Sequence, residues 1–186
     1  MIKIILIFLF LFFKSFANAN IKLQIIDNFK NIKNLKFEFV QKIGKKTESG
    51  DCIIDYSEKK ILCKYNDVHD KVMVSNGNSL FINSKKKKQY YRYALDKTPL
   101  FIILNKKLLI KKMENSLNKK ILKNSYSFET SHENYLINFY FNKYNLDFMG
   151  WSTTDIYQNK VETKISNIKT NIELDNKIFR IQKYIN

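Results

Sequence analysis

The sequence predicts a mainly β protein: a large antiparallel sheet with one helix before it and helices inserted in its middle. Apolar residues recur at helical spacing from Ile21 to Ile32, and from Leu35 onward the pattern changes to the alternation that is typical of strands. Further alternating segments continue along the chain, interrupted by an apolar helical segment after Pro99. No regular succession of strand, helix and strand indicates a parallel sheet.

The first 19 residues have the pattern of a secretory signal peptide. A short positive start precedes an apolar run from Ile4 to Phe13, and a small-x-small cleavage site ends at Ala19. The run is shorter than the about 20 residues that cross a bilayer. We therefore expect a signal peptide at 1–19 and a single domain at 20–186 that works outside the cytoplasm; the alternative is an uncleaved anchor. Residue 20 is Asn and not Cys, so the signal is not the type that ends in a lipid-modified cysteine.

The formal net charge of +16 is carried almost entirely by lysine, and without the two lysines of the signal segment it is +14. One interpretation is a solvated surface set by a composition rich in Lys, Asn and Ile. The other is attraction to anionic lipid head groups or to an acidic partner. Specific nucleic-acid readers favour arginine, and the chain has only Arg92 and Arg180, so we expect no nucleic-acid partner.

The order of the elements follows from local signals. Asn76-Gly77 between two apolar segments is a strong hairpin signal. Thr98 and Pro99 fit a helix N-cap and first helical position. Because the segment after them is apolar nearly all round, another part of the protein must cover it. We expect helices at about 20–34, 98–104 and 108–117, and strands at 35–41, 50–55, 60–65, 71–75, 79–83, 89–95, 121–130, 135–141, 148–157 and 160–174.

The chain carries no recognisable catalytic or metal-binding motif. His69 and His132 are far apart, and the carboxylates are scattered. There is no HExxH, no CxxC, no Gly-rich phosphate loop and no G-x-S-x-G segment. We therefore expect a protein that is not an enzyme, with no catalytic residue, metal or cofactor.

The two cysteines, Cys52 and Cys63, flank the segment 56–59. If that segment is a four-residue hairpin loop, Asp55 pairs with Lys60 and the cysteines lie opposite each other at a non-hydrogen-bonded site. The Cα atoms at such a site are about 4.5 Å apart, which is within disulfide reach. In an oxidising compartment we predict a disulfide. The alternative is two reduced cysteines that pack as small apolar residues.

Several short motifs occur in an order that is more specific than any one of them. They are Phe39-Val40-Gln41, Gly50, the segment Val72 to Gly77, Leu80-Phe81, Thr98-Pro99-Leu100, Gly150-Trp151, Asp155, Thr163-Lys164-Ile165, Asn171, Leu174-Asp175 and Phe179. Together they resemble the outer-membrane lipoprotein carrier family, LolA, over essentially the whole chain after the signal segment.

The resemblance implies an unclosed antiparallel β-barrel whose helices form a lid over an apolar cavity. It also implies a periplasmic chaperone that carries acylated lipoproteins from the inner to the outer membrane. Its expected partners are these lipoproteins, an inner-membrane ABC-type lipoprotein-releasing complex and an outer-membrane acceptor, and we expect a monomer. The alternative is a module of the same fold that binds lipid or glycolipid, or senses envelope stress.

The helix after Pro99 is the candidate lid, and the expected acyl-chain-binding residues lie on it and on the sheet below. Leu100, Ile103 and Leu104 are the candidates on the helix, with Phe39, Ile61 and Phe81 facing them from the strands. The competing interpretation is that these side chains fill a solid core.

One feature of the family is absent. Its carriers commonly show an arginine followed by proline in the first hairpin, which is thought to latch the lid. The corresponding segment in this chain is Asp55-Tyr56-Ser57, with Lys59 and Lys60 after it. A latch of the family's type therefore has no arginine here.

Overall fold

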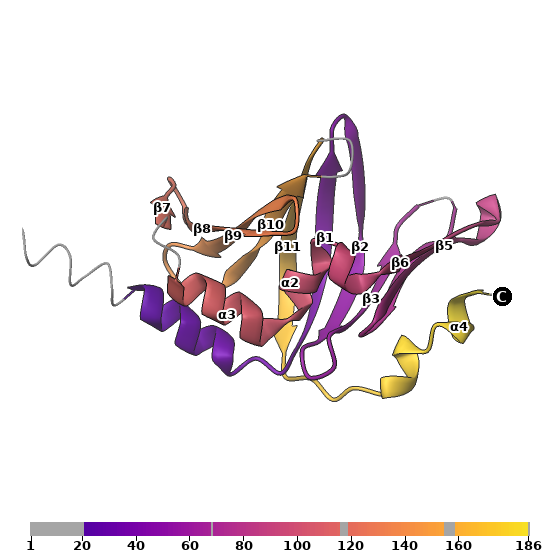
Figure 1. The fold of residues 1–186 in the computed structure, drawn as a ribbon, viewed down its shortest axis with the longest axis horizontal. Coiled ribbons are helices and arrows are strands. Elements are labelled where there is room, and N and C mark those ends of the chain that lie inside the picture. Colours follow the sequence, from indigo (N-terminus) through magenta and orange to yellow (C-terminus); the bar gives the residue numbers. More distant parts are fainter. Residues whose placement is uncertain (1–20, 68, 116–118, 155–158, 186) are drawn as a thin grey trace, which may run out of the picture.

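The computed structural model describes residues 21–67, 69–115, 119–154 and 159–185; the predicted signal segment lies outside them. Its centre is one antiparallel sheet of 11 strands with the spatial order β6-β5-β4-β3-β2-β1-β11-β10-β9-β8-β7 (Figure 1). Within the described residues, β6 and β7 form the two edges and do not pair, so the barrel is not closed. The predicted fold class is confirmed. The strands are β1 (Asn34–Ile43), β2 (Lys46–Asp55), β3 (Lys60–Tyr65), β4 (Lys71–Asn76), β5 (Ser79–Ser84), β6 (Gln89–Ala94), β7 (Lys119–Ile121), β8 (Ser125–His132), β9 (Tyr135–Asn142), β10 (Phe148–Thr154) and β11 (Lys160–Thr170).

Several strand boundaries differ from the prediction; among them, β11 ends at Thr170 and not at 174. Strand β2 begins at Lys46 because Gly44, with a φ of +56°, allows a two-residue turn that pairs Ile43 with Lys46. The segment expected as one strand at 121–130 is divided between β7 and β8, which pair with each other. The Asn76-Gly77 hairpin is present: the Asn76 side chain accepts hydrogen bonds from the two amides that follow Gly77.

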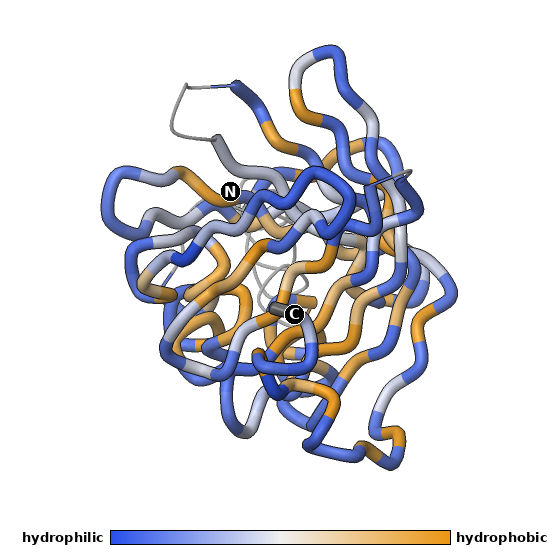
Figure 2. Tube along the Cα trace, turned by 90° about the vertical axis from the view of Figure 1, so that its right-hand side faces the viewer, coloured by the Kyte–Doolittle hydropathy of each residue, from blue (hydrophilic) through white to orange (hydrophobic). Residues whose placement is uncertain are grey.

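The inner face of the sheet is defined by the alternating side chains of β1 and β9. Leu35, Phe37 and Phe39 are each at most 4% exposed. Ile137, Phe139 and Phe141 are buried on the same side, as their alternation predicts. Figure 2 shows hydrophobic segments along the strands and hydrophilic ones in most turns.

The helices on the inner face form the lid layer. The N-terminal helix buries Ile25, Ile26 and Phe29 in the main core, and it lies beside α3 (Figure 1). Lys106 of α3 donates hydrogen bonds to the carbonyl oxygens of Lys30 and Ile32 at 2.8 and 2.7 Å. The helices are 21–30, α2 (Leu100–Leu104), α3 (Lys106–Asn115) and α4 (Gln182–Ile185), with 3₁₀ turns η1 (Lys85–Lys87), η2 (Leu95–Lys97) and η3 (Asn176–Phe179).

The start of α2 differs from the prediction. Pro99, not Thr98, is the N-cap residue, and it makes no side-chain cap. The Thr98 hydroxyl instead donates a hydrogen bond back to the Leu95 carbonyl at 2.8 Å, which closes the preceding turn.

The outer face of the sheet is covered locally by the C-terminal segment. Phe179 of η3, Tyr184 of α4 and Ile181 between them pack on side chains of β3, β4 and β5 to form a second apolar cluster. No described helix combines the length and apolar composition that a membrane crossing needs.

Candidate functional site

An apolar cavity of about 350 Å³ lies between the inner face of the sheet and the helix α2. Its walls come from β1 to β6 and β9 to β11, and Pro99, Leu100 and Ile103 line it from the lid side. The volume falls at the lower end of the about 300–1,000 Å³ that is typical of ligand pockets. A solid core would leave no such space, so the inner face is only partly filled by its own side chains.

Four of the six predicted acyl-chain-binding residues line this cavity. Phe39 and Ile61 line it from the sheet, and Leu100 and Ile103 from α2. The i, i+3 spacing of the two lid residues places them on one side of the helix. Ile102, on the opposite side, is fully buried in the main core. The helix is apolar all round because one side faces the cavity and the other faces the core.

The prediction that Phe81 faces the cavity is wrong. Phe81 lies on the outer face, in the cluster covered by the C-terminal segment, while its neighbours Leu80 and Ile82 line the cavity. Strand β5 is apolar on both faces, so its pattern does not select which alternate residues point inward.

The prediction for Leu104 is also wrong. Leu104 is fully buried in the main core and does not line the cavity. It is the last residue of α2, where the chain turns into α3. A charge at Leu104 would therefore disturb folding rather than test the cavity.

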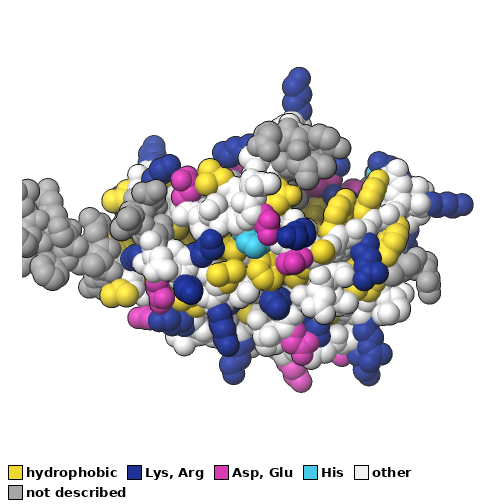
Figure 3. Space-filling view, in the orientation of Figure 1, with side chains coloured by type: hydrophobic (Ala, Val, Ile, Leu, Met, Phe, Trp, Pro, Cys, Tyr) yellow, Lys and Arg dark blue, Asp and Glu magenta, His cyan; other side chains and the backbone are white. Residues whose placement is uncertain are grey.

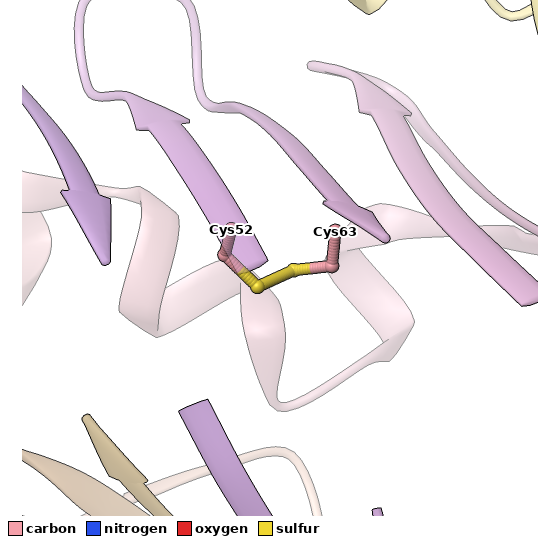
Figure 4. Close-up of a disulfide and its surroundings, with 2 residues drawn as sticks. All are labelled: Cys52 and Cys63. Carbon is pink, nitrogen blue, oxygen red and sulfur yellow. A yellow bond between two sulfur atoms is a disulfide. The ribbon is translucent and has the colours of Figure 1, made fainter. Parts of the chain in front are cut away.

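Cys52 and Cys63 form part of the cavity wall and are joined by a disulfide (Figure 4). The strands pair Asp55 with Lys60 and Cys52 with Cys63, which is the register that a four-residue loop requires. The Cα atoms of the two cysteines are 4.1 Å apart. The bond links β2 to β3 beneath the lid.

Loss of this disulfide should lower the free energy of unfolding by about 2–3 kcal/mol, because the short loop it closes restricts the unfolded chain. For a domain of this size we expect a fall in Tm of roughly 5–10 °C in the variant with Cys52→Ala and Cys63→Ala. Thermal unfolding with and without reductant measures it. The reductant should lower the Tm of the wild type and leave that of the variant unchanged. Peptide mapping that finds two free thiols in protein taken from an oxidising compartment would contradict the prediction.

A charged group that the sequence did not indicate lies in the same wall. The Glu48 side chain is only 5% exposed and accepts hydrogen bonds from Lys46 and, at 2.7 Å, from Lys71. The Lys71 ammonium also lies 3.9 Å from the centre of the Tyr65 ring, which in turn packs edge-on against Phe39. Burial, with Glu48 and Asp67 nearby, raises the pKa of Tyr65, so its hydroxyl stays neutral.

Glu48 should make stability depend on pH. Burial alone would raise the pKa of its carboxyl, but hydrogen bonds from Lys46 and Lys71 outweigh burial and hold it below the ordinary 4.5. A lowered folded-state pKa stabilises the fold above the unfolded-state value, and that contribution is lost as pH falls through the folded-state value. We expect the Tm of the wild type to fall more steeply below pH 4.5 than that of Glu48→Gln. Parallel slopes in thermal melts from about pH 6 to about pH 3 would exclude this role.

The lid has contacts with the hairpins on either side of it. Lys59 of the β2–β3 hairpin lies 5.8 Å from the centre of the Phe101 ring of α2. The His132 ring also stacks on Phe101, at 5.1 Å between ring centres. The β2–β3 hairpin thus touches the lid through a lysine, although it has no arginine.

The lid side of the molecule carries dispersed basic side chains, with exposed apolar side chains at one edge of the sheet. Figure 3, in which the helices lie in front of the sheet, shows Lys and Arg side chains scattered over this side and hydrophobic side chains over β5 and β6, among other places. All six residues of β6 are exposed, and its three tyrosines are 45–47% exposed. Tyr93 also lines the cavity, so this edge borders its mouth.

Sequence comparison decides the family. The family model of the outer membrane lipoprotein carrier protein LolA matches residues 30–182, which is most of the chain. This chain belongs to the LolA family. No curated protein is similar to it in sequence at a significant level.

Solved structures share the LolA-like fold at low identity. An uncharacterised conserved protein from Thermus thermophilus is 6% identical, with 88% of this chain and 93% of that chain covered and a TM-score of 0.53. A DUF1329 family protein from Desulfovibrio piger is 10% identical, with coverage of 90% and 98% and a TM-score of 0.50. A putative outer membrane lipoprotein-sorting protein domain from Vibrio parahaemolyticus is 11% identical, with coverage of 88% and 98% and a TM-score of 0.50. At these identities the similarity concerns the fold alone.

Proposed function

We propose that this protein is a periplasmic carrier that holds the acyl chains of lipoproteins in the cavity under α2. One observation carries the proposal: in a chain of the LolA family, the lid and sheet form the walls of an open-mouthed apolar cavity at the place where a solid core would otherwise lie. Its lining is mostly aliphatic and aromatic, including Phe39, Ile61, Leu80 and Ile103. Such a lining suits hydrocarbon chains.

The energetics explain why a carrier of this kind is needed. Each buried methylene is worth about 0.8 kcal/mol, so acyl chains of some tens of methylenes are held in a bilayer by roughly 30 kcal/mol. That exceeds what noncovalent association usually reaches, so spontaneous desorption is negligible. The carrier must therefore be loaded by a partner that extracts the chains and unloaded by an acceptor that holds them more tightly. We propose an inner-membrane ABC-type complex and an outer-membrane acceptor for these steps.

Movement of the helix α2 would let acyl chains enter and leave the cavity. Helix α2 has only five residues, and its contacts with the flanking hairpins are single side-chain contacts from Lys59 and His132 to Phe101. Pro99 precedes it and Asn105 follows it, so the moving segment would be short, and its movement would withdraw Ile102 and Leu104 from the main core. Displacement of α2 would expose Leu100 and Ile103 together with the cavity that they cover.

The test is release of a lipoprotein from inner-membrane spheroplasts. Spheroplasts that contain the cognate loading complex and a radiolabelled lipoprotein are incubated with purified protein, and the supernatant is assayed for the label. We expect the released label to rise with the amount of added protein. In the control without added protein, the label in the supernatant should stay at background. If the wild type releases no lipoprotein in the presence of its loading complex, the proposal is wrong.

A further inference from the structure

The two edge strands of the sheet differ in length and in side chains. Strand β7 has three described residues, two of which are lysines, and short strands with charged side chains are a common protection of sheet edges. The opposite edge strand, β6, has six residues, three of which are tyrosines. It contains no proline, and its pairing with β5 has no bulge. The edge at β6 is therefore the one that is suited to pairing with a further strand.

The free hydrogen-bonding groups of β6 belong to Tyr90, Arg92 and Ala94. The Leu95 N–H donates a hydrogen bond to the Asn78 carbonyl oxygen at 2.8 Å, and these two residues continue the register of β5 and β6. In an antiparallel pair, residues that exchange hydrogen bonds alternate with residues that do not. The backbone N–H and C=O groups of Tyr90, Arg92 and Ala94 therefore point away from β5, along the open edge.

Aromatic side chains flank this edge on both faces of the sheet. On the inner face Tyr93 lines the cavity, as does Leu80, with which it pairs. On the outer face the Tyr90 ring lies 5.7 Å from the Phe81 ring, between ring centres, and the Arg92 guanidinium lies over the same Phe81 ring. The tyrosines of β6 are 45–47% exposed, so an added strand would bury aromatic surface on each face.

The charge around β6 indicates what kind of strand the edge suits. The segment 85–97, which comprises β6 and the turns at its two ends, has five lysines and one arginine against one aspartate. Two of the lysines pair with carboxylates of neighbouring segments. Among the described residues, no carboxylate oxygen lies within 4 Å of the ammonium groups of Lys85, Lys87 or Lys88. An acidic strand would therefore be attracted to this edge.

Other occupants fit the edge less well. A second copy of the protein would bring the same positive segment against itself, and like charges on paired strands are destabilising. The hydrocarbon of a bilayer cannot accept or donate hydrogen bonds, so it would leave the free backbone groups of β6 unsatisfied. An extended acidic polypeptide satisfies both the backbone groups and the charge.

We propose that the free edge of β6 binds an extended, acidic segment of the lipoprotein cargo as an added strand. The inference rests on the proposed function, because it takes the acyl chains in the cavity to be attached to the N-terminus of that polypeptide. The residues that follow the acylated end leave the cavity at its mouth, which β6 borders through Tyr93. This tether raises the effective concentration of the segment at the edge, so a pairing that is weak by itself contributes to the affinity.

The test uses acylated peptides that differ only in backbone methylation. A peptide of three Asp-Asp-Val-Val repeats with an N-terminal dodecanoyl group is titrated into the purified protein by calorimetry, below its micellar concentration. Two further versions carry N-methyl groups on all even or on all odd residues, because one set of amides in a strand faces β6 and the other faces away. We expect one methylated version to bind at least about tenfold more weakly than the unmodified peptide, as the loss of several backbone hydrogen bonds predicts. The other should stay within about threefold of it.

The inference requires the two methylated versions to differ. Equal affinities of the two overturn it, whether both match the unmodified peptide or both are weaker. Dodecanoyl-glycinamide, which has the same acyl chain and no peptide segment, separates this inference from the proposed function. If this probe binds as tightly as the unmodified peptide, the inference fails and the proposed function stands. If neither probe binds, both fail.

Ala94→Pro places the added strand at β6. Ala94 has a φ of −65°, the value that proline requires, and its N–H points away from β5, so the substitution removes one free donor and leaves the pairing with β5 intact. It should weaken the unmodified peptide several-fold and leave dodecanoyl-glycinamide unchanged. Ala94→Ser, which keeps the N–H, is the matched control. Equal affinities of the two variants for the peptide would overturn the placement. A wild type that sediments as a dimer, with a monomeric Ala94→Pro, would assign the edge to a second copy and overturn the inference.

Lysine variants test the choice of an acidic segment. The combined variant Lys85→Gln, Lys87→Gln and Lys88→Gln should reduce the preference for the acidic peptide over an Asn-Asn-Val-Val version by at least about threefold. The matched control makes the same charge change at three exposed lysines of β11 and the β7–β8 turn, Lys123, Lys164 and Lys169. An equal reduction in the two combined variants, or no reduction in either, would contradict the selection of an acidic segment by this edge.

Discussion

Ile103→Glu should abolish acyl-chain binding while the sheet stays folded. Ile103 is 1% exposed and lines the cavity from α2, so the carboxylate would either be buried in an apolar space or force the lid open. Either outcome removes the enclosed apolar surface on which binding depends. We expect the affinity for dodecanol, or for a fluorescent fatty-acyl probe, to fall at least about 100-fold, which corresponds to roughly 3 kcal/mol.

Ile103→Val is the matched control for this variant. It removes one methyl group at the same position and should change the affinity by less than about fivefold, since one buried methylene is worth about 0.8 kcal/mol. Far-ultraviolet circular dichroism checks that the sheet is intact. Normal probe binding by Ile103→Glu, with the sheet intact, would show that the cavity under α2 is not the acyl-chain site.

Gly150→Ala should be among the most destabilising single substitutions in the protein. Gly150 has a φ of +131°, and a Cβ built on it would lie 2.0 Å from the Thr163 carbonyl oxygen. The neighbouring atom belongs to the backbone of β11, so a side-chain movement cannot relieve the clash. Strained backbone costs about 1–3 kcal/mol by itself, and with the clash we expect a loss of at least about 3 kcal/mol in the free energy of unfolding.

Gly44→Ala provides the comparison for Gly150→Ala. Gly44 also has a positive φ, of +56°, but a Cβ there would meet no atom within 4 Å. The Gly44→Ala substitution should lower the free energy of unfolding by only about 1–2 kcal/mol, because L residues disfavour this conformation. Urea unfolding measures both, and equal losses would contradict the argument that β11 approaches Gly150 too closely for a side chain.

Local patterns predicted most of the fold. The alternation at Leu35, Phe37 and Phe39 is unambiguous because one face of β1 is buried and the other is exposed. The Cys52–Cys63 register followed from the length of the intervening loop. These features depend on neighbours within a few residues, and such neighbours are visible in a sequence.

The errors arose where distant parts of the chain decide the outcome. Phe81 points outward because the C-terminal segment, which is far from β5 along the chain, covers that face of the strand. Leu104 packs into the core because the chain turns there into α3. Neither the C-terminal segment nor α3 can be inferred from the residues next to Phe81 or Leu104 in the sequence.

The buried ion pair of Glu48 and Lys71 could not be predicted for a related reason. Glu48 lies in the polar start of β2, which resembles a loop, and Lys71 is 23 residues away in the sequence. The one signal that could have found Glu48 is its alternation with Gly50 and Cys52, had the strand been extended back to the Gly44 turn.

Native mass spectrometry of the protein purified from its own cells, with any cargo that it retains, tests the central claim most directly. The account predicts an adduct whose mass and fragments identify a protein with an acylated N-terminal cysteine. It also predicts that this adduct is absent from Ile103→Glu purified in the same way. The account would be contradicted if the wild type carried no acylated protein in cells that make lipoproteins, or if the adduct persisted in Ile103→Glu.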